Sequence, residues 1–373
     1  MKTRSTFFRR LGAAIALTSA LGSATAAFAD QSLDLQRAWA IYNQHNLVSN
    51  GAVPADHTDI NLINAWGIAF NPFGVAWVAN NHSGTTTLYD GSGNPQTLVV
   101  SIPTPTSTTG GSATGIVFNA STGFVVTAGT ATGAARFIFA TEEGVIAAWS
   151  PTADATHALT MVDNSARNAI YKGAALSAGG SGQLLYATDF HNGTVDVFDN
   201  KFAPVTLAAG AFKDDKLPRG FAPFGIQAIG GDIYVTYALQ DADREDELHG
   251  TGLGYVDVYD PNGNLIRRVA SAGALNAPWG VALAPAGFGP FSNMLLIGNF
   301  GDGHINAYDP VLGTPARELR GPYHRPIQID GLWGIGFGNG SANQPVNTLF
   351  FAAGPHDEGD GLYGRIDVDS ASY

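Results

Sequence analysis

Histidines and carboxylates recur along this chain at one kind of place, directly after a short apolar run that we predict to be a β-strand. Seven of them are candidates for chemistry: His82, Glu142, Asp189, His191, Asp302, His356 and Asp357. Imidazole and carboxylate groups are the usual protein ligands of zinc and calcium, and polar groups of this kind line small-molecule sites. If the predicted strands all end on one face, these side chains form an acidic, His-bearing rim.

Three of the histidines suggest a metal site. His82, His191 and His356 hold similar places in three repeats of the chain. Three imidazoles that face one channel could bind zinc and leave the fourth position open for water. In the alternative, each histidine follows its strand and only caps the turn. A divalent metal, zinc or calcium, is therefore a candidate cofactor.

A second set of candidates lies at the start of the repeats, close to a glycine. Trp66, Phe224, Trp279 and Trp333 directly precede that glycine and could stack on a flat or sugar-like ligand. Large aromatic side chains at this place could instead fill the inner end of the channel. Asn64, Asn276 and Asp330 lie two or three residues earlier and could offer oxygen ligands to calcium at the channel mouth.

The most polar stretch of the chain is QDADREDELHGTG, residues 240–252. It begins like a calcium loop but lacks the glycine and the final glutamate of an EF-hand. Its five carboxylates repel one another, so we predict an extended lid that a cation or a basic partner orders. No G-x-S-x-G or H-E-x-x-H motif occurs in the chain.

Two sets of repeated glycines predict the elements that position these residues. A Gly followed by alternating apolar residues occurs six times, as in GTVDVFD (193–199), GYVDVYD (254–260) and GHINAYD (303–309). A second glycine opens each repeat, for example in NAWG, APFG and APWG. Short strands separated by Gly, Pro and Asn indicate an all-β protein, and six such units predict a six-bladed β-propeller with four-stranded blades. We expect residues 39–48 to supply the last blade with its outermost strand, antiparallel to residues 364–369.

Composition limits the other possibilities. Residues 1–29 have a basic start, the apolar run 11–21 and the small-x-small site Ala27-Phe28-Ala29, which predicts a signal peptide cleaved near Ala29. We therefore expect one domain over 30–373, exported to the periplasm or the medium. The net charge of −12 disfavours nucleic acid, no later apolar run is long enough to span a membrane, and there is no cysteine. We expect a monomer.

The repeats also resemble known families. LYATDFHNGTVDVFD (185–199) resembles an NHL repeat, and the blades resemble the six-bladed propellers of the SMP-30-like calcium-dependent lactonases and the peptidyl-amidating lyase. Segments such as NAPWGVALAP (276–285) and GLWGIGFGNG (331–340) are similar to an exported bacterial family of conserved hypothetical proteins. The lactonases place Asn before the opening glycine, where this chain has Trp66, Thr114, Lys172, Phe224, Trp279 and Trp333. This departure argues against a lactonase-type calcium site.

Together these features predict an exported β-propeller that binds a small-molecule or extracellular ligand, or a partner, on its acidic rim. The alternative function is a metal-dependent hydrolase or lyase, lactonase-like or amidating-lyase-like, that uses the same rim.

Overall fold

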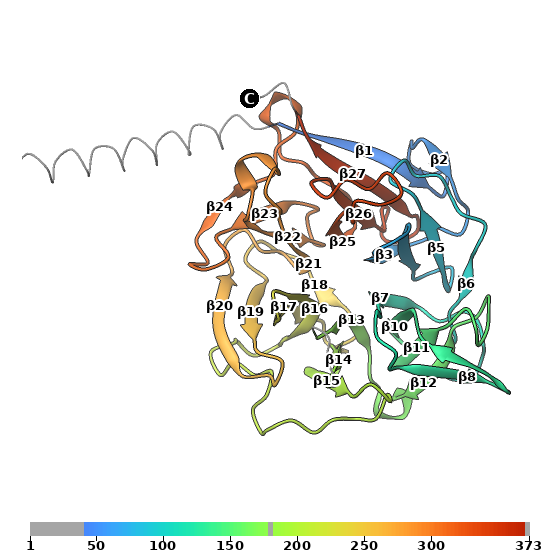
Figure 1. The fold of residues 1–373 in the computed structure, drawn as a ribbon. Helices are drawn as coiled ribbons and strands as arrows, with labels where there is room; N and C mark the ends of the chain where they lie inside the picture. Colours follow the sequence, from blue (N-terminus) through green and yellow to red (C-terminus); the bar gives the residue numbers. More distant parts are fainter. Residues whose placement is uncertain (1–40, 178–181, 370–373) are drawn as a thin grey trace, which may run out of the picture.

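The computed structural model describes residues 41–177 and 182–369, and their strands form a ring of six sheets around a central axis (Figure 1). The described residues contain no α-helix, only three short 3-10 turns at Ser165–Arg167, Gly289–Phe291 and Pro322–His324. The predicted six-bladed β-propeller is confirmed. The predicted signal peptide lies outside the described residues, and none of the described helices is long and apolar enough to cross a membrane.

Each blade is an antiparallel sheet whose first strand lies innermost. Blade 1 contains β3 (Ala65–Phe70), β4 (Ala76–Asn80), β5 (Thr85–Tyr89) and β6 (Val100–Ser101). Blade 2 contains β7 (Ala113–Phe118), β10 (Phe137–Thr141), β11 (Val145–Trp149) and β12 (Leu159–Asp163), and the hairpin β8 (Val125–Ala128) and β9 (Ala131–Ala134) follows its first strand. Blade 3 has only β13 (Tyr171–Leu176), β14 (Leu185–Asp189) and β15 (Thr194–Phe198).

The second half of the ring repeats this order. Blade 4 contains β16 (Phe221–Ile229), β17 (Asp232–Gln240), β19 (Tyr255–Tyr259) and β20 (Leu265–Ser271), with the short β18 (Glu247–Leu248) paired to β17. Blade 5 contains β21 (Pro278–Leu283), β22 (Leu295–Asn299), β23 (Ile305–Tyr308) and β24 (Pro315–Glu318). Blade 6 contains β25 (Leu332–Phe337), β26 (Leu349–Ala353) and β27 (Leu362–Val368).

The sixth blade takes its outermost strand from the other end of the chain. Strand β1 (Tyr42–Ser49) pairs antiparallel with β27, with Tyr42 opposite Val368 and Ser49 opposite Leu362. A two-residue strand, β2 (His57–Thr58), lies parallel to β1 on its outer side. The predicted closure is therefore confirmed, although residues 39 and 40 of the predicted strand lie outside the described part of the chain. The pairing removes the exposed sheet edge that an open ring would leave.

Blade 3 departs from the four-stranded plan. After β15, the chain makes one bridge from Phe198 to Pro204, and the Val205 N–H donates to the Val197 carbonyl at 2.8 Å. These contacts do not continue into a regular fourth strand, so the sheet of blade 3 has three strands.

The glycines that open the repeats allow the inner strands of neighbouring blades to approach one another closely. A Cβ placed on Gly225 would lie 2.1 Å from the carbonyl oxygen of Trp279, on the first strand of the next blade. The equivalent distance is 2.2 Å from Gly115 to the Ala174 nitrogen and 2.5 Å from Gly334 to the Trp66 oxygen. No other residue type fits here, because any side chain would collide with the neighbouring backbone. The first strands thereby lie close together around the central axis of the ring.

Candidate ligand site at the channel mouth

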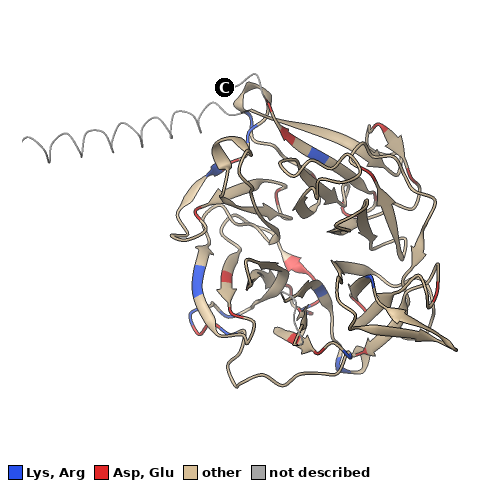
Figure 2. Cartoon of the chain, in the orientation of Figure 1, with Lys and Arg blue, Asp and Glu red and all other residues tan. Residues whose placement is uncertain are grey.

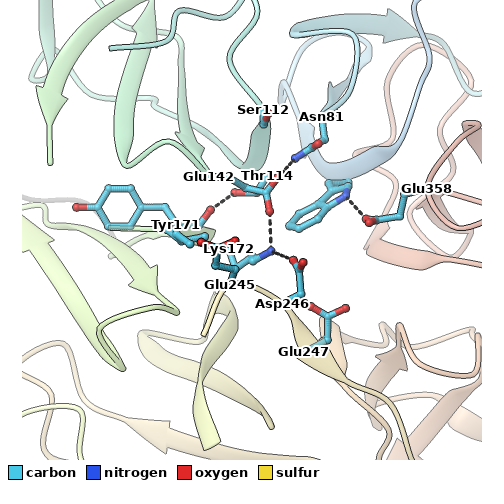
Figure 3. A network of polar contacts seen from close by, with 12 residues as sticks. Asn81, Ser112, Thr114, Glu142, Tyr171, Lys172, Glu245, Asp246, Glu247 and Glu358 are labelled. Carbon is cyan, nitrogen blue, oxygen red and sulfur yellow. Dashed lines mark hydrogen bonds and ion pairs between the residues drawn. The ribbon is translucent and has the colours of Figure 1, made fainter. Parts of the chain in front are cut away.

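A buried lysine lies at the centre of the ring, on the face where the second strands of the blades end. Lys172 comes from β13 of blade 3, and its side chain is 1% exposed. Its Nζ donates to Glu142 Oε1 at 2.6 Å and to Asp246 Oδ1 at 3.1 Å (Figure 3). Burial alone would lower the pKa of Lys172, but Glu142, Glu247 and Asp246 outweigh it and raise the pKa above its usual range. Lys172 is therefore an ammonium, a buried charge that is paired as such charges must be.

Glu142 is the inner partner of this lysine and follows the second strand of blade 2. Its other carboxylate oxygen accepts a hydrogen bond from Asn81 Nδ2 of blade 1 at 2.8 Å. Burial would raise the pKa of Glu142, but the Lys172 ammonium and the two hydrogen bonds hold it below the usual value. Glu142 is therefore ionised, and Asn81, which is 2% exposed, has a carbonyl oxygen with no hydrogen-bond partner.

A second carboxylate enters from blade 6. Glu358 Oε1 accepts from Asn64 Nδ2 at 3.0 Å and from the indole N–H of Trp66 at 3.3 Å. Burial and the nearby charges of Glu247 and Glu142 raise the pKa of Glu358 despite these hydrogen bonds. Burial is the largest cause of this shift, and the two neighbouring carboxylates add to it while the Lys172 ammonium opposes it.

The insertion of blade 4 supplies the remaining charged groups. Strand β18 brings its acidic residue to the middle of the ring, whereas most Lys and Arg residues lie on outer strands and loops in the view of Figure 2. The Glu247 side chain is only 6% exposed, and its Oε1 lies 3.3 Å from Nε2 of His249. The hydrogen bond to Glu247 is the main cause that raises the pKa of His249. We call Glu142, Lys172, Asp246, Glu247, His249 and Glu358 the mouth cluster.

The insertion is folded, contrary to the extended lid predicted from its charges. Leu239 and Gln240 of β17 pair with Leu248 and Glu247 of β18, and the Asp241 N–H donates to the Asp246 carbonyl at 2.8 Å. Repulsion among the carboxylates is offset because Asp246 reaches the Lys172 ammonium. Lys172 thus supplies one cation to this acidic segment from within the chain.

Beneath the mouth cluster, aromatic side chains fill the channel. Trp333 stacks between Trp66, with ring centroids 3.7 Å apart, and Phe300, at 3.8 Å. Phe224 and Trp279 pack against the same group, and the Trp279 N–H donates to the Lys172 carbonyl. Trp66, Phe224 and Trp333 are buried, so they plug the channel, as the alternative interpretation of the sequence held. The indole N–H of Trp333 is buried without a hydrogen-bond partner.

A cavity of about 380 Å³ adjoins this plug between blades 5 and 6. It is lined by Phe300, Gly301, Asp302, Gly303, Gln328, Asp330 and Gly331. Phe300 connects the cavity with the mouth cluster, because its ring stacks on Trp333 and contacts the His249 ring edge-on at 5.0 Å. A volume of this size admits a small molecule.

The rim residues predicted from the sequence have different surroundings. Glu142 is in the mouth cluster, and Asp302 lines the adjoining cavity. Asp189 accepts hydrogen bonds from the Ile170 and Asn192 N–H groups and holds a turn together. Asp357 is exposed.

The three histidines do not come together. His82 is exposed, His191 is half-buried, and His356 Nδ1 pairs with Asp360 at 2.7 Å. Within residues 41–177 and 182–369, no group of three or more His, Asp or Glu side chains is placed to hold a metal ion. The residues present therefore do not fit the zinc site suggested by His82, His191 and His356.

The oxygen donors considered for calcium are engaged with protein groups. Asn64 bonds to Glu358 and Trp66, and Asn276 accepts from the Gly250 N–H at 2.7 Å. Asp330 accepts from the His356 N–H at 2.9 Å. These residues position the loops around the mouth.

Sequence reasoning placed Asp246, Glu247 and His249 in the acidic insertion but did not select Lys172 as a site residue. The position of Lys172 in its repeat could have marked it as a site residue. Lys172 occupies the position directly before the opening glycine, where four of the other five blades carry Trp or Phe. A charged residue at an otherwise aromatic, buried position requires a partner nearby.

Comparison with known proteins places the chain among relatives and confirms the fold. An uncharacterized protein of Acanthamoeba polyphaga mimivirus is 34% identical over 347 residues, which cover 91% of this chain and 83% of the viral protein. A second uncharacterized mimivirus protein is 31% identical over 357 residues, with 91% and 89% of the two chains covered. No protein-family model matches. The predicted membership of an exported bacterial family stays a prediction, since these relatives are viral.

Solved structures of low sequence identity share the propeller fold. A streptogramin B lyase is 14% identical with a TM-score of 0.52, covering 89% of this chain and 99% of the lyase. A protein of unknown function from Bacteroides thetaiotaomicron is also 14% identical, with a TM-score of 0.53 and coverage of 88% and 76%. Such likeness shows the fold alone. Sequence identity above 30% over nine-tenths of the chain shows common family membership. The protein therefore belongs to the same family as the two mimivirus proteins.

Proposed function

We propose that this protein binds a small ligand at the channel mouth, in contact with the mouth cluster. The observation that carries the proposal is the convergence of Glu142, Lys172, Glu247 and Glu358 from four different blades onto one point above the aromatic plug. Stability alone gives little reason to bury so many charges, because desolvation offsets most of the gain from a buried ion pair. Perturbed charged groups beside a cavity are characteristic of binding sites.

The predicted signal peptide supports binding outside the cytoplasm, in the periplasm or the medium. The support consists of the basic start, the apolar run 11–21 and the site at Ala27-Phe28-Ala29. Expression of the full chain, followed by N-terminal sequencing of the exported product, tests this part of the proposal.

A second candidate function is acid–base catalysis on the bound ligand, as in a lyase or hydrolase. It is favoured by His249, whose half-exposed imidazole is held by Glu247 at 3.3 Å beside Phe300. A histidine oriented by a carboxylate is a common general base or acid. The streptogramin B lyase has this fold, so the fold can carry lyase chemistry. This likeness does not indicate the substrate of the present protein.

A thermal-shift screen tests the binding proposal. The panel contains organic ammonium compounds, neutral sugars and carboxylic acids, applied to the wild type and to Glu358→Gln. Binding at the mouth raises the melting temperature of the wild type, and the variant changes the response to the same compounds. The proposal is wrong if no class shifts the melting temperature. Conversion of a bound compound by the wild type, but not by His249→Gln, would establish the second function.

A further inference from the structure

We infer that the ligand of the channel mouth is an organic cation bearing N–H groups, a primary ammonium or a guanidinium. The inference rests on the proposed function and names its ligand class. Three independent observations support it: the charge of the mouth cluster, an unpartnered buried acceptor, and an aromatic face that already holds a cation.

The charge of the mouth cluster is the first observation. Its carboxylates are Glu142, Asp246, Glu247 and Glu358, and its cations are Lys172 and, when protonated, His249. Four negative charges therefore face at most two positive ones. Glu247, 6% exposed, has only His249 within ion-pair distance among the described residues. A cation placed between Glu247 and Glu358 would offset the charge of both carboxylates, and the charge of Glu247 is, after burial, one of the causes that raise the pKa of Glu358.

The unpartnered acceptor is the second observation. Asn81 is 2% exposed, and its Nδ2 donates to Glu142 at 2.8 Å, which fixes the orientation of the amide. Its side chain points toward the centre of the network in Figure 3, and its Oδ1 has no hydrogen-bond partner. A buried carbonyl oxygen without a donor costs free energy, and a ligand N–H group at this point would satisfy it. An anion or a tetraalkylated cation has no such donor.

The aromatic face is the third observation. Lys172 Nζ lies 5.3 Å from the centroid of the Trp66 ring, so this indole already stabilises one ammonium. The Trp66 N–H is bound to Asn64 and Glu358, which fixes the plane of the ring. Trp66 is 2% exposed and stacks on Trp333, so a ligand cation would meet this tryptophan through Glu358, which accepts its N–H. Within the described residues no metal-binding group occurs, and this favours an organic cation over a metal ion.

Calorimetric titration with small probes tests the inference. The probes are n-butylammonium, tetramethylammonium, n-butanol, butyrate and calcium, each at the same low ionic strength. We expect n-butylammonium to bind at least about tenfold more tightly than each other probe, because it alone combines a positive charge with N–H donors. Glu247→Gln and Glu358→Gln keep the shape of the side chain and should each weaken this binding about tenfold. Asp243→Asn, in the exposed tip of the same insertion, is the matched control and should leave it unchanged.

The outcomes separate this inference from the function on which it rests. Tighter binding of butyrate, n-butanol or calcium than of n-butylammonium would overturn the cationic class and leave ligand binding intact. Equal binding of tetramethylammonium would overturn the need for an N–H donor. If none of the five probes binds, the inference fails, and only a further failure of the broad thermal-shift panel rejects the proposed function. Should a variant fold poorly, the order of the probes on the wild type still decides.

Discussion

Replacing Lys172 by methionine should destabilise the protein by leaving Glu142 without its cation. The methionine fills most of the volume of the lysine chain but provides no charge at the point where Nζ lies 2.6 Å from Glu142. Removing one partner of a buried ion pair costs about 3–5 kcal/mol. The Glu142 side chain is 28% exposed and keeps its bond to Asn81, so we expect the lower end, about 3 kcal/mol.

The expected shift of the melting temperature follows from the size of the domain. Unfolding entropy is roughly 2.1 cal/mol/K per residue, so a loss of about 3 kcal/mol lowers the melting temperature of a domain of this size by about 4 °C. Thermal melts followed by circular dichroism, with urea titrations as a check, measure the loss. Glu142→Gln and the double variant Lys172→Met/Glu142→Gln complete a cycle, in which the double variant should lose clearly less than the two single losses combined.

The stability that the Lys172–Glu142 pair contributes should depend on pH. The pKa of Glu142 is lowered in the folded protein, so its stabilising contribution is present above its usual pKa of 4.5 and is lost as the pH falls through the lowered value. The pKa of Lys172 is raised, so its contribution is present below 10.5 and is lost only at strongly alkaline pH. The difference between wild type and Lys172→Met should therefore be largest between these limits. Single losses that simply add, or a difference independent of pH, would show that Lys172 acts by packing alone.

Three further predictions concern neighbouring features. Glu358→Gln should raise the free energy of unfolding at pH 7 and not at about pH 4, because burial and neighbouring carboxylates raise the Glu358 pKa and its charge costs stability only when ionised; urea titrations at both pH values measure this. The NMR titration midpoint of His249 should lie above 6.5 and move down in Glu247→Gln, since Glu247 is the main cause of the raised pKa; an unmoved midpoint would contradict the pair. Gly225→Ala should cost at least about 3 kcal/mol, because its Cβ would lie 2.1 Å from the next blade's backbone, whereas Gly182→Ala, with open space around it, should melt like the wild type.

Much of the fold could be predicted because the constraints are local and repeated. The glycine within each inner strand packs closely against the next blade, so it recurs in every blade as a visible pattern. Closure by residues 42–49 could be predicted because the last repeat stops one strand short. The three-stranded blade 3 could not be predicted, since a short run ending in Pro204 resembles an irregular strand in sequence.

The site was harder to predict, because its bonds join residues far apart in the chain. Lys172 meets Glu142 and Asp246 at separations of 30 and 74 residues, and no local pattern encodes such pairs. The predicted histidines occupy equivalent positions in three repeats. Equivalent positions place residues on the same face of the ring, but they do not bring the side chains to one point. The folded insertion was missed for a related reason. The prediction considered only the charges within the insertion and ignored Lys172, which the closed ring brings close to Asp246.

The pairing of β1 with β27 has a consequence for how the chain folds. Five blades can form from contacts within one repeat, but the sixth waits until Tyr42 meets Val368, nearly the whole described chain away. Closing so long a loop is entropically slow, and folds rich in distant contacts fold slowly. Until the ends meet, β27 presents an unpaired edge to other chains. Expression yield should therefore depend on β1 far more than its eight residues would suggest, since this strand protects every folding intermediate that already contains blade 6.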